Sequence, residues 1–226
     1  MPDEAAEYRN SIGMEFVLIP AGEFMMGSEN GEDDEKPVHQ VIISRSYYLG
    51  KFVVTQVQWE TVTGNNPSHF TGSNLPVEMV SWEDCQEFIQ RLNAWEGGTA
   101  YRLPTEAEWE RACRTGTTED DMGNLDAMAW YDKTSYGQTH PVGQKQPNAW
   151  GLYDMHGNVW EWCQDWYDSY PSGTVTDPVG PSSGSRRVVR GGGWGIDAPR
   201  CRSACRGLTP APHASYLGVR LLRTAG

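Results

Sequence analysis

Short apolar stretches separated by turn residues dominate the first fifty residues of the chain. The segments 16–20 and 22–27 flank a Pro-Ala-Gly turn at residues 20–22, which predicts two short strands. The segment 38–44 alternates and then becomes apolar, and 47–49 continues in the same way. Both are therefore expected to be further strands of a sheet.

Two short helices are predicted from start and stop signals. Thr55 is expected to cap a helix that Gly64 stops. Thr105 and Glu108 have the spacing of a capping box, in which each residue bonds the backbone of the other. They predict another helix that reaches about Arg114.

The strongest helical pattern begins at Ser81, with Asp84 three residues later as a variant of the capping box, and ends at Gly97. Apolar residues recur here every three or four positions, which predicts one buried stripe along a helix. The stripe is expected to consist of Trp82, Cys85, Phe88, Ile89, Leu92 and Trp95.

No helical period is found after Gly116, where turns, short strands and aromatic residues dominate. Helices in the first half and irregular strands in the second indicate an α+β fold around one core. We therefore expect a polar lead-in at residues 1–12 and a single domain over 13–226. The charge runs at 33–35 and 119–121 are expected to be solvated loops.

Composition and charge exclude several classes of protein. The 226 residues carry 18 Lys and Arg against 30 Asp and Glu, a net charge of −12. Such a surface repels phosphate backbones and anionic lipids, so neither nucleic acid nor a membrane is expected as the main partner. No apolar run approaches the roughly 18 residues of a membrane span, and the N-terminus is acidic, so a cytoplasmic location is expected.

The cysteines predict neither a disulfide framework nor a zinc site. There are five, an odd number, and no CxxC pair occurs. Free thiols are expected in a chain of this length. The five histidines do not fall at zinc-ligand spacing.

Six segments in order resemble one family. They are GMEFVLIPAGEFMMGS (13–28), LPVEMVSWED (75–84), YRLPTEAEWE (101–110), NAWGLYDMHGNVWEW (148–162), RGGGW (190–194) and LGVRL (217–221). Together they resemble the formylglycine-generating-enzyme-like, or sulfatase-modifying-factor, family. The resemblance implies a C-type-lectin-like fold with much irregular structure. The family contains copper-dependent oxidases and also binding proteins, so the fold does not decide the function.

In the oxidases of this family, two cysteines five residues apart bind Cu(I), a soft ion that favours soft ligands. The resemblance places the second of them at Cys201 and the first at Ile196. Isoleucine cannot bind copper, and Cys205 would substitute only if the backbone rearranged. Buried structural thiols are the expected alternative. Copper is therefore a cofactor only under an oxidase hypothesis that uses Cys201, with or without Cys205.

The resemblance also implies a structural calcium site in the segment 154–161. The ligands carried over from the family are the side chains of Asp154 and Glu161 and the carbonyls of Gly157 and Val159. Oxygen ligands that include two carboxylates suit Ca²⁺. A metal-free turn, in which these acids bond backbone amides, is the alternative.

The segment 188–222 resembles the variable region of the target proteins of diversity-generating retroelements. A skeleton of apolar, Gly and Arg residues is interrupted by residues without any periodicity. Apolar and aromatic residues on exposed loops are typical of binding surfaces. The candidate ligand-binding residues are Ile196, Asp197, Pro199, Arg200, Gly207, Leu208, His213, Ser215 and Tyr216.

Three hypotheses of function follow. The favoured one is a non-catalytic protein that binds a protein or other macromolecular ligand through this surface. The second is a copper-dependent formylglycine-generating-type oxidase or related metal oxidoreductase. The third is an accessory domain that docks to a partner chain. An ordinary family member whose loops have drifted would also explain the irregular residues.

Overall fold

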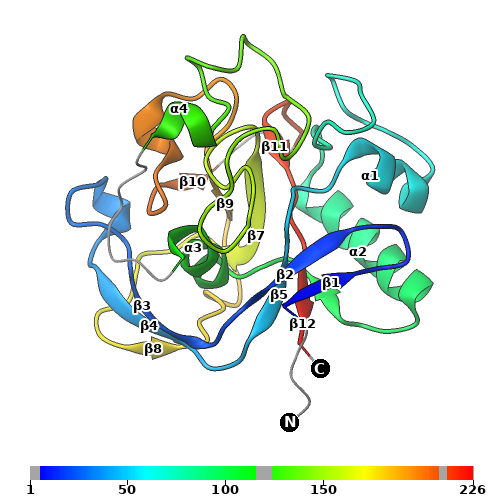
Figure 1. Cartoon of the computed structure of the whole chain (residues 1–226). Helices are drawn as coiled ribbons and strands as arrows, with labels where there is room; N and C mark the ends of the chain where they lie inside the picture. The colour runs from blue at the N-terminus through cyan, green and yellow to red at the C-terminus, as the bar shows by residue number, and fades with distance from the viewer. Residues whose placement is uncertain (1–5, 116–123, 209–212, 226) are drawn as a thin grey trace.

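Figure 1 shows the computed structural model, which describes residues 6–115, 124–208 and 213–225. Its strands are β1 (Glu7–Arg9), β2 (Glu15–Ile19), β3 (Gly22–Met26), β4 (His39–Ile43), β5 (Tyr47–Gly50), β6 (Tyr101–Arg102), β7 (Trp160–Trp166), β8 (Val175–Thr176), β9 (Arg187–Arg190), β10 (Arg206–Leu208), β11 (Leu217–Gly218) and β12 (Leu222–Thr224). Its helices are α1 (Gln56–Thr63), α2 (Trp82–Glu96), α3 (Glu106–Arg114) and α4 (Leu125–Met128), with 3-10 turns η1 (Asp33–Glu35) and η2 (Ala198–Cys201). This mixed content, with long irregular segments, confirms the expected α+β class.

A five-stranded sheet joins the two ends of the chain. Its order is β1-β2-β5-β12-β6, so the last strand lies between β5 and β6. Leu222 of β12 is opposite Leu49 on one side and Arg102 on the other. Figure 1 shows β12, in red, beside the light blue strand β5. The C-terminal residues are therefore an integral part of the scaffold.

The four predicted strands are β2, β3, β4 and β5, to within about two residues. β1 was not predicted, because it lies within the expected polar lead-in. It pairs antiparallel with β2, and Tyr8 is opposite Phe16. The Tyr8 ring lies 5.9 Å from the Phe16 ring and 6.0 Å from the Tyr48 ring. These aromatic contacts hold a strand whose other residues are polar.

The three predicted helices are α1, α2 and α3, and each begins with a complete capping box. The stripe of α2 is buried at Cys85, Phe88, Ile89 and Leu92. Trp82 is only half-buried, and Trp95 is 57% exposed, so including Trp95 in the buried stripe was wrong. Trp95 stands in the last turn of α2, beyond the surface that the helix covers.

The second half of the chain builds a four-stranded sheet of order β10-β9-β7-β11. The expectation that no helix follows Gly116 was wrong in detail, because α4 and η2 each form about one turn. A four-residue helix is too short to leave a periodic signal in the sequence. The rest of this half runs in turns around the sheet, as Figure 1 shows.

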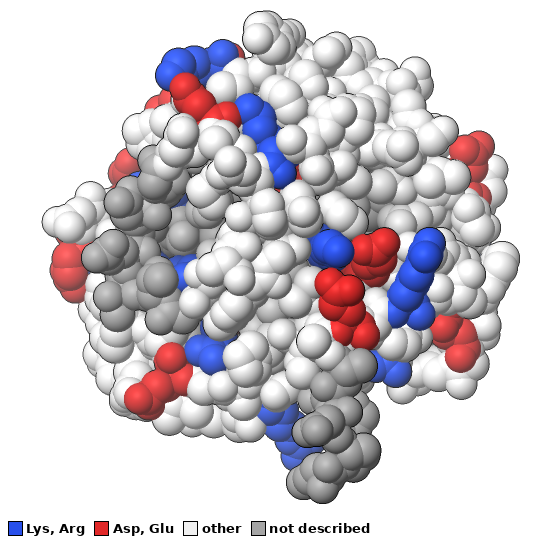
Figure 2. Space-filling model, in the orientation of Figure 1, with Lys and Arg blue, Asp and Glu red and all other residues white. Residues whose placement is uncertain are grey.

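Charged side chains are interspersed on the face seen in Figure 2, where Lys and Arg alternate with Asp and Glu without forming a large patch of one sign. No helix in the described part of the chain has the length and apolarity that a membrane crossing requires.

Candidate functional site

A groove of about 850 Å³ lies where η2 and β10 meet. Seven of the nine candidate ligand-binding residues line it, namely Ile196, Asp197, Pro199, Arg200, Gly207, Leu208 and Tyr216. Trp160 of β7 and Val189 of β9 also line it, and the acidic residues Glu32, Asp33 and Asp34 stand on its rim. Residues that are scattered over 196–216 in the sequence are thus gathered around one cavity.

Exposed groove residues alternate with a buried skeleton. Asp197, Pro199, Arg200 and Leu208 are exposed. Between them the skeleton is buried at Cys201, Ser203, Ala204, Cys205 and Arg206. Ile196 and Tyr216 are half-buried and pack against the main hydrophobic core. The side chains at the exposed positions can therefore change with little effect on the core.

Two candidate residues lie outside this groove. His213 is exposed, and its Nε2 lies 3.0 Å from Oδ2 of Asp84 at the start of α2. Ser215 supplies a carbonyl that accepts a hydrogen bond from Nε1 of Trp194 at 2.8 Å. The structure does not bring these two residues into the cavity that the other seven share.

Gly207 lines the groove but is held by packing. A Cβ at this position would lie 2.7 Å from the Trp160 ring and 2.8 Å from Cγ2 of Val189. Real Cβ atoms are not found that close to other atoms, so any side chain here would force a buried residue to move. Gly207 is therefore part of the skeleton, contrary to its assignment as a surface position.

A buried charge network connects the skeleton to α3. Arg190 is fully buried; it pairs with Glu110, and its NH1 donates to the Ser203 carbonyl at 3.0 Å. Arg206 donates from Nε and NH2 to both oxygens of Glu106, at 2.7 and 2.9 Å. The groove floor is thus fixed to a helix almost a hundred residues earlier in the sequence.

The acidic rim is anchored in the same way. Arg202 donates from NH1 and NH2 to the two oxygens of Glu35, at 2.8 and 2.5 Å. Glu35 is fully buried, so the expectation of a solvated loop at 33–35 was wrong for this residue. The other charge run, at 119–121, lies outside the described residues.

The thiols near the groove do not fit the copper pair of the oxidases. All five cysteines are free and buried. Burial raises the pKa of Cys201 to about 12 and that of Cys205 to about 11. Copper binds thiolates, so both shifts oppose binding. Ile196, which is at the position of the first oxidase cysteine, lines the groove and offers no ligand.

The calcium ligands carried over from the family lie in one buried loop. Glu161 is fully buried and accepts hydrogen bonds from Arg220 at 2.7 and 2.9 Å and from Nε1 of Trp109 at 2.6 Å. Asp154 is 2% exposed; its Oδ2 accepts from the Gly143 amide at 2.8 Å, but its buried Oδ1 has no partner. Burial raises the pKa of Asp154 to about 6.

Two carbonyls complete this donor set. Outside the strand ladders, no backbone N–H among the described residues donates to the carbonyl of Gly157 or Val159. The same part of the chain holds no group of three His, Cys, Asp or Glu side chains that would bind a metal. A cation here would depend on main-chain oxygens together with the unpaired oxygen of Asp154, which is chemistry that Ca²⁺ accepts.

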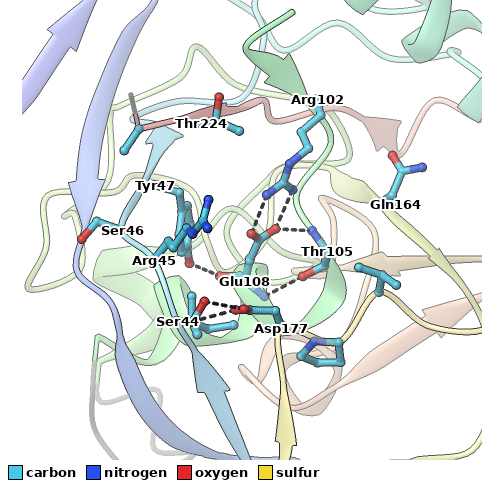
Figure 3. A pocket seen from close by; sticks show the side chains of 14 residues that line it. Ser44, Arg45, Ser46, Tyr47, Arg102, Thr105, Glu108, Gln164, Asp177 and Thr224 are labelled. Carbon is cyan, nitrogen blue, oxygen red and sulfur yellow. Dashed lines mark hydrogen bonds and ion pairs between the residues drawn. The ribbon is translucent and has the colours of Figure 1, made fainter.

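A second cavity, of about 370 Å³, is shown in Figure 3. Arg102 donates to both oxygens of Glu108, at 2.7 and 2.6 Å. Asp177 accepts from the amide of Ser44 at 2.8 Å and from its hydroxyl at 2.5 Å. Both carboxylates at the centre of the view are thus engaged, and neither is free to act as an acid or a base.

The α+β scaffold and the groove on its irregular half define a domain of the C-type-lectin-like class. The chain belongs to the family of the sulfatase-modifying factor enzyme 1-like domain, whose profile matches residues 3–225.

The names of similar proteins point to different functions. Treponema denticola variable protein 1 superposes with a TM-score of 0.90 at 31% identity, over 98% of this chain and 100% of that one. The formylglycine-generating enzyme of Streptomyces coelicolor is 30% identical, over 99% of this chain and 93% of the enzyme. Chaperone protein LppX of Paenibacillus barcinonensis is 31% identical, over 81% of this chain and 80% of that protein. The family and the likeness to variable proteins are thereby confirmed.

Sequence reasoning missed the acidic rim and the buried charge network. Glu106 and Glu110 lie four residues apart on the predicted third helix, and Arg190 opens the Gly-Gly-Gly-Trp motif. Charged residues in otherwise apolar motifs are the one local signal for buried pairs. That signal does not say which residues pair.

Proposed function

We propose that this protein binds a macromolecular ligand, most simply a protein, through the groove and without catalysis. The observation that carries the proposal is the gathering of six irregular positions, together with Gly207, around one cavity, while Cys201 and residues 203–206 among them are buried. The TM-score of 0.90 to a variable protein supports it. The thiols, which do not fit a copper pair, support binding over oxidation.

The groove offers what a binding site needs. Trp160, Val189, Ile196 and Leu208 give it an apolar lining, and charged residues surround the rim. Affinity at such interfaces comes from a few central side chains in a rigid, desolvated pocket. The buried charge network supplies the rigidity, because it fixes the floor to α3.

We also propose that the groove positions are diversified, as the likeness to a variable protein suggests. Sequencing the flanking locus, and this gene in sibling isolates, tests this part of the proposal. We expect a near-copy of codons 188–226 that differs only at template adenines. Among siblings, positions 196, 197, 199, 200, 208 and 216 should vary, while Gly207 stays fixed because a side chain would collide with Trp160. Absence of any such copy, with all these positions invariant, would count against a diversified site.

The groove surface should tolerate substitution that the skeleton does not. The Arg200 side chain is 65% exposed, and Leu208 is 36% exposed. The double variant Arg200→Ala/Leu208→Ala should change the free energy of unfolding by less than about 1 kcal/mol. The matched control Val189→Ala removes a buried side chain and should cost about 2 kcal/mol. Urea unfolding followed by tryptophan fluorescence measures both, and equal losses would contradict the division into surface and skeleton.

We also propose that the loop 154–161 holds a structural Ca²⁺. The unpaired Oδ1 of Asp154 and the two unengaged carbonyls support this assignment. Arg220 already neutralises Glu161, so the uncompensated charge in the loop is that of Asp154. Such an ion would stiffen the chain that leads into β7 on the groove floor.

A further inference from the structure

A cavity of about 480 Å³ lies beside the N-terminal turn of α3 and shares one lining residue, Arg206, with the groove. Loops that follow β7 and β8 form its other walls. Most of its lining is apolar or aromatic, including Met26, Tyr170, Pro171, Val175, Val179 and Pro181. A cavity of this size and composition suits a small organic molecule.

Asp165 and His39 offer hydrogen-bond acceptors to this cavity, beside the hydroxyls of Ser169 and Thr176. Asp165 is 5% exposed, and its Oδ2 accepts from the Glu106 amide at 2.9 Å. His39 is 4% exposed and has Nδ1 3.1 Å from the Pro37 carbonyl. A ring nitrogen that faces a carbonyl carries the proton, so the other nitrogen, Nε2, is an acceptor in the neutral ring. Within the described residues, Nε2 of His39 has no hydrogen-bond partner.

The acidic residues that line this cavity outnumber its basic residues. Arg206 is the one Lys or Arg among the described lining residues, and Glu106 engages it through both oxygens. Asp165 and Asp168 also line the cavity, and neither forms an ion pair with a described residue. Burial, and secondarily the charge of Glu106, raises the pKa of Asp165 to about 7. A cation bound beside Asp165 would relieve that penalty.

We propose that this cavity binds a small organic cation, with an ammonium group at Asp165 and an apolar or aromatic body against Tyr170 and Val179. The ammonium supplies the donors that the acceptors of the cavity lack. Its body fills the apolar walls formed by Val175, Val179 and Pro181. The Tyr170 ring contributes to these walls and is itself held by the Arg206 guanidinium, 4.0 Å from its centroid, and by the His39 ring at 4.8 Å. The head group is assigned to Asp165, which lines this cavity and not the groove; Arg206 is the residue that the two share.

Titration calorimetry at about pH 8 tests the proposal with three probes of similar shape. Phenethylammonium, phenethyl alcohol and phenylacetate differ only in the charge and hydrogen bonding of the head group. We expect the cation to bind, with the neutral and anionic probes at least about tenfold weaker. Equal affinity for the cation and the alcohol would overturn the assignment of the head group.

Two variants locate the head group. Asp165→Asn keeps an oxygen for the Glu106 amide but loses the charge, so it should weaken the cation at least about tenfold. The matched control Asp168→Asn alters the exposed carboxylate of the same cavity and should change affinity by less than about threefold. Thermal unfolding shows that both variants fold. Unchanged binding to Asp165→Asn would exclude Asp165 as the cation partner, whatever the groove binds.

Discussion

Replacing Glu110 with glutamine should lower the free energy of unfolding by about 3–5 kcal/mol, the cost of breaking a buried ion pair. Glu110 is fully buried, and its Oε1 accepts from Nε of Arg114 at 2.7 Å and from the Gly27 amide at 2.9 Å. Its Oε2 pairs with Arg190. The substitution keeps the volume of the side chain but leaves two buried guanidinium groups with one negative charge fewer.

The control for this experiment is Glu87→Gln on α2. Glu87 pairs with Arg91 at 2.5 Å, but the two side chains are 60% and 48% exposed. Surface pairs contribute little, so the loss should stay below about 1 kcal/mol. Urea unfolding at neutral pH measures both variants. A loss in Glu110→Gln no larger than in Glu87→Gln would mean that the network does not hold the fold.

Loss of the Glu110 charge should also make the floor of the groove less rigid. Arg190 holds the Ser203 and Cys205 carbonyls, which belong to the buried skeleton between the groove positions. A guanidinium that has lost its main partner positions these carbonyls less firmly. Amide hydrogen exchange at residues 203–206 should therefore speed up in Glu110→Gln more than in Glu87→Gln.

The sequence predicted those elements whose signals are local. Caps at Ser81 and Thr105 and the glycines at 64 and 97 fix the helix ends through neighbouring backbone atoms, and the structure confirms them. β1 was missed because its place depends on the contact of Tyr8 with Phe16 and Tyr48, not on its own pattern.

The same distinction applies to the groove. Positions 196–208 are close in sequence, and their irregular character was visible there. The acidic rim comes from residues 32–34, more than 150 residues earlier. The pairing of Arg202 with Glu35 and the hydrogen bond from Arg206 to the Asp34 carbonyl hold it at the groove. In the sequence Gly207 is indistinguishable from a loop glycine, and only the structure shows that Trp160 and Val189 pack against it. Local sequence patterns do not show which residues pair over long distances or which side chains pack against a glycine.

Calcium should stabilise the protein, and this stabilisation should depend on the carboxylate of Asp154. Without calcium, the pKa of Asp154 in the folded protein is about 6, against an ordinary value of 3.8, because the carboxyl group is buried. Between these values the folded state keeps a proton that the unfolded state has lost. The contribution of Asp154 to the free energy of unfolding therefore falls as pH rises from about 4 to about 6, by roughly 3 kcal/mol in total.

Asp154→Asn removes the titrating group, and asparagine tolerates the left-handed backbone at this position, where φ is 57°. In calcium-free buffer the variant should lack the Asp154 part of the pH dependence, whereas Asp132→Asn, at an exposed acid, should keep it. At neutral pH, calcium at a hundred times its dissociation constant should raise the free energy of unfolding of the wild type by about 2.7 kcal/mol. It should raise that of Asp154→Asn less, because one carboxylate is gone. If calcium leaves the unfolding midpoint of the wild type unchanged, the loop does not bind calcium, and the buried carboxylate of Asp154 has no metal partner.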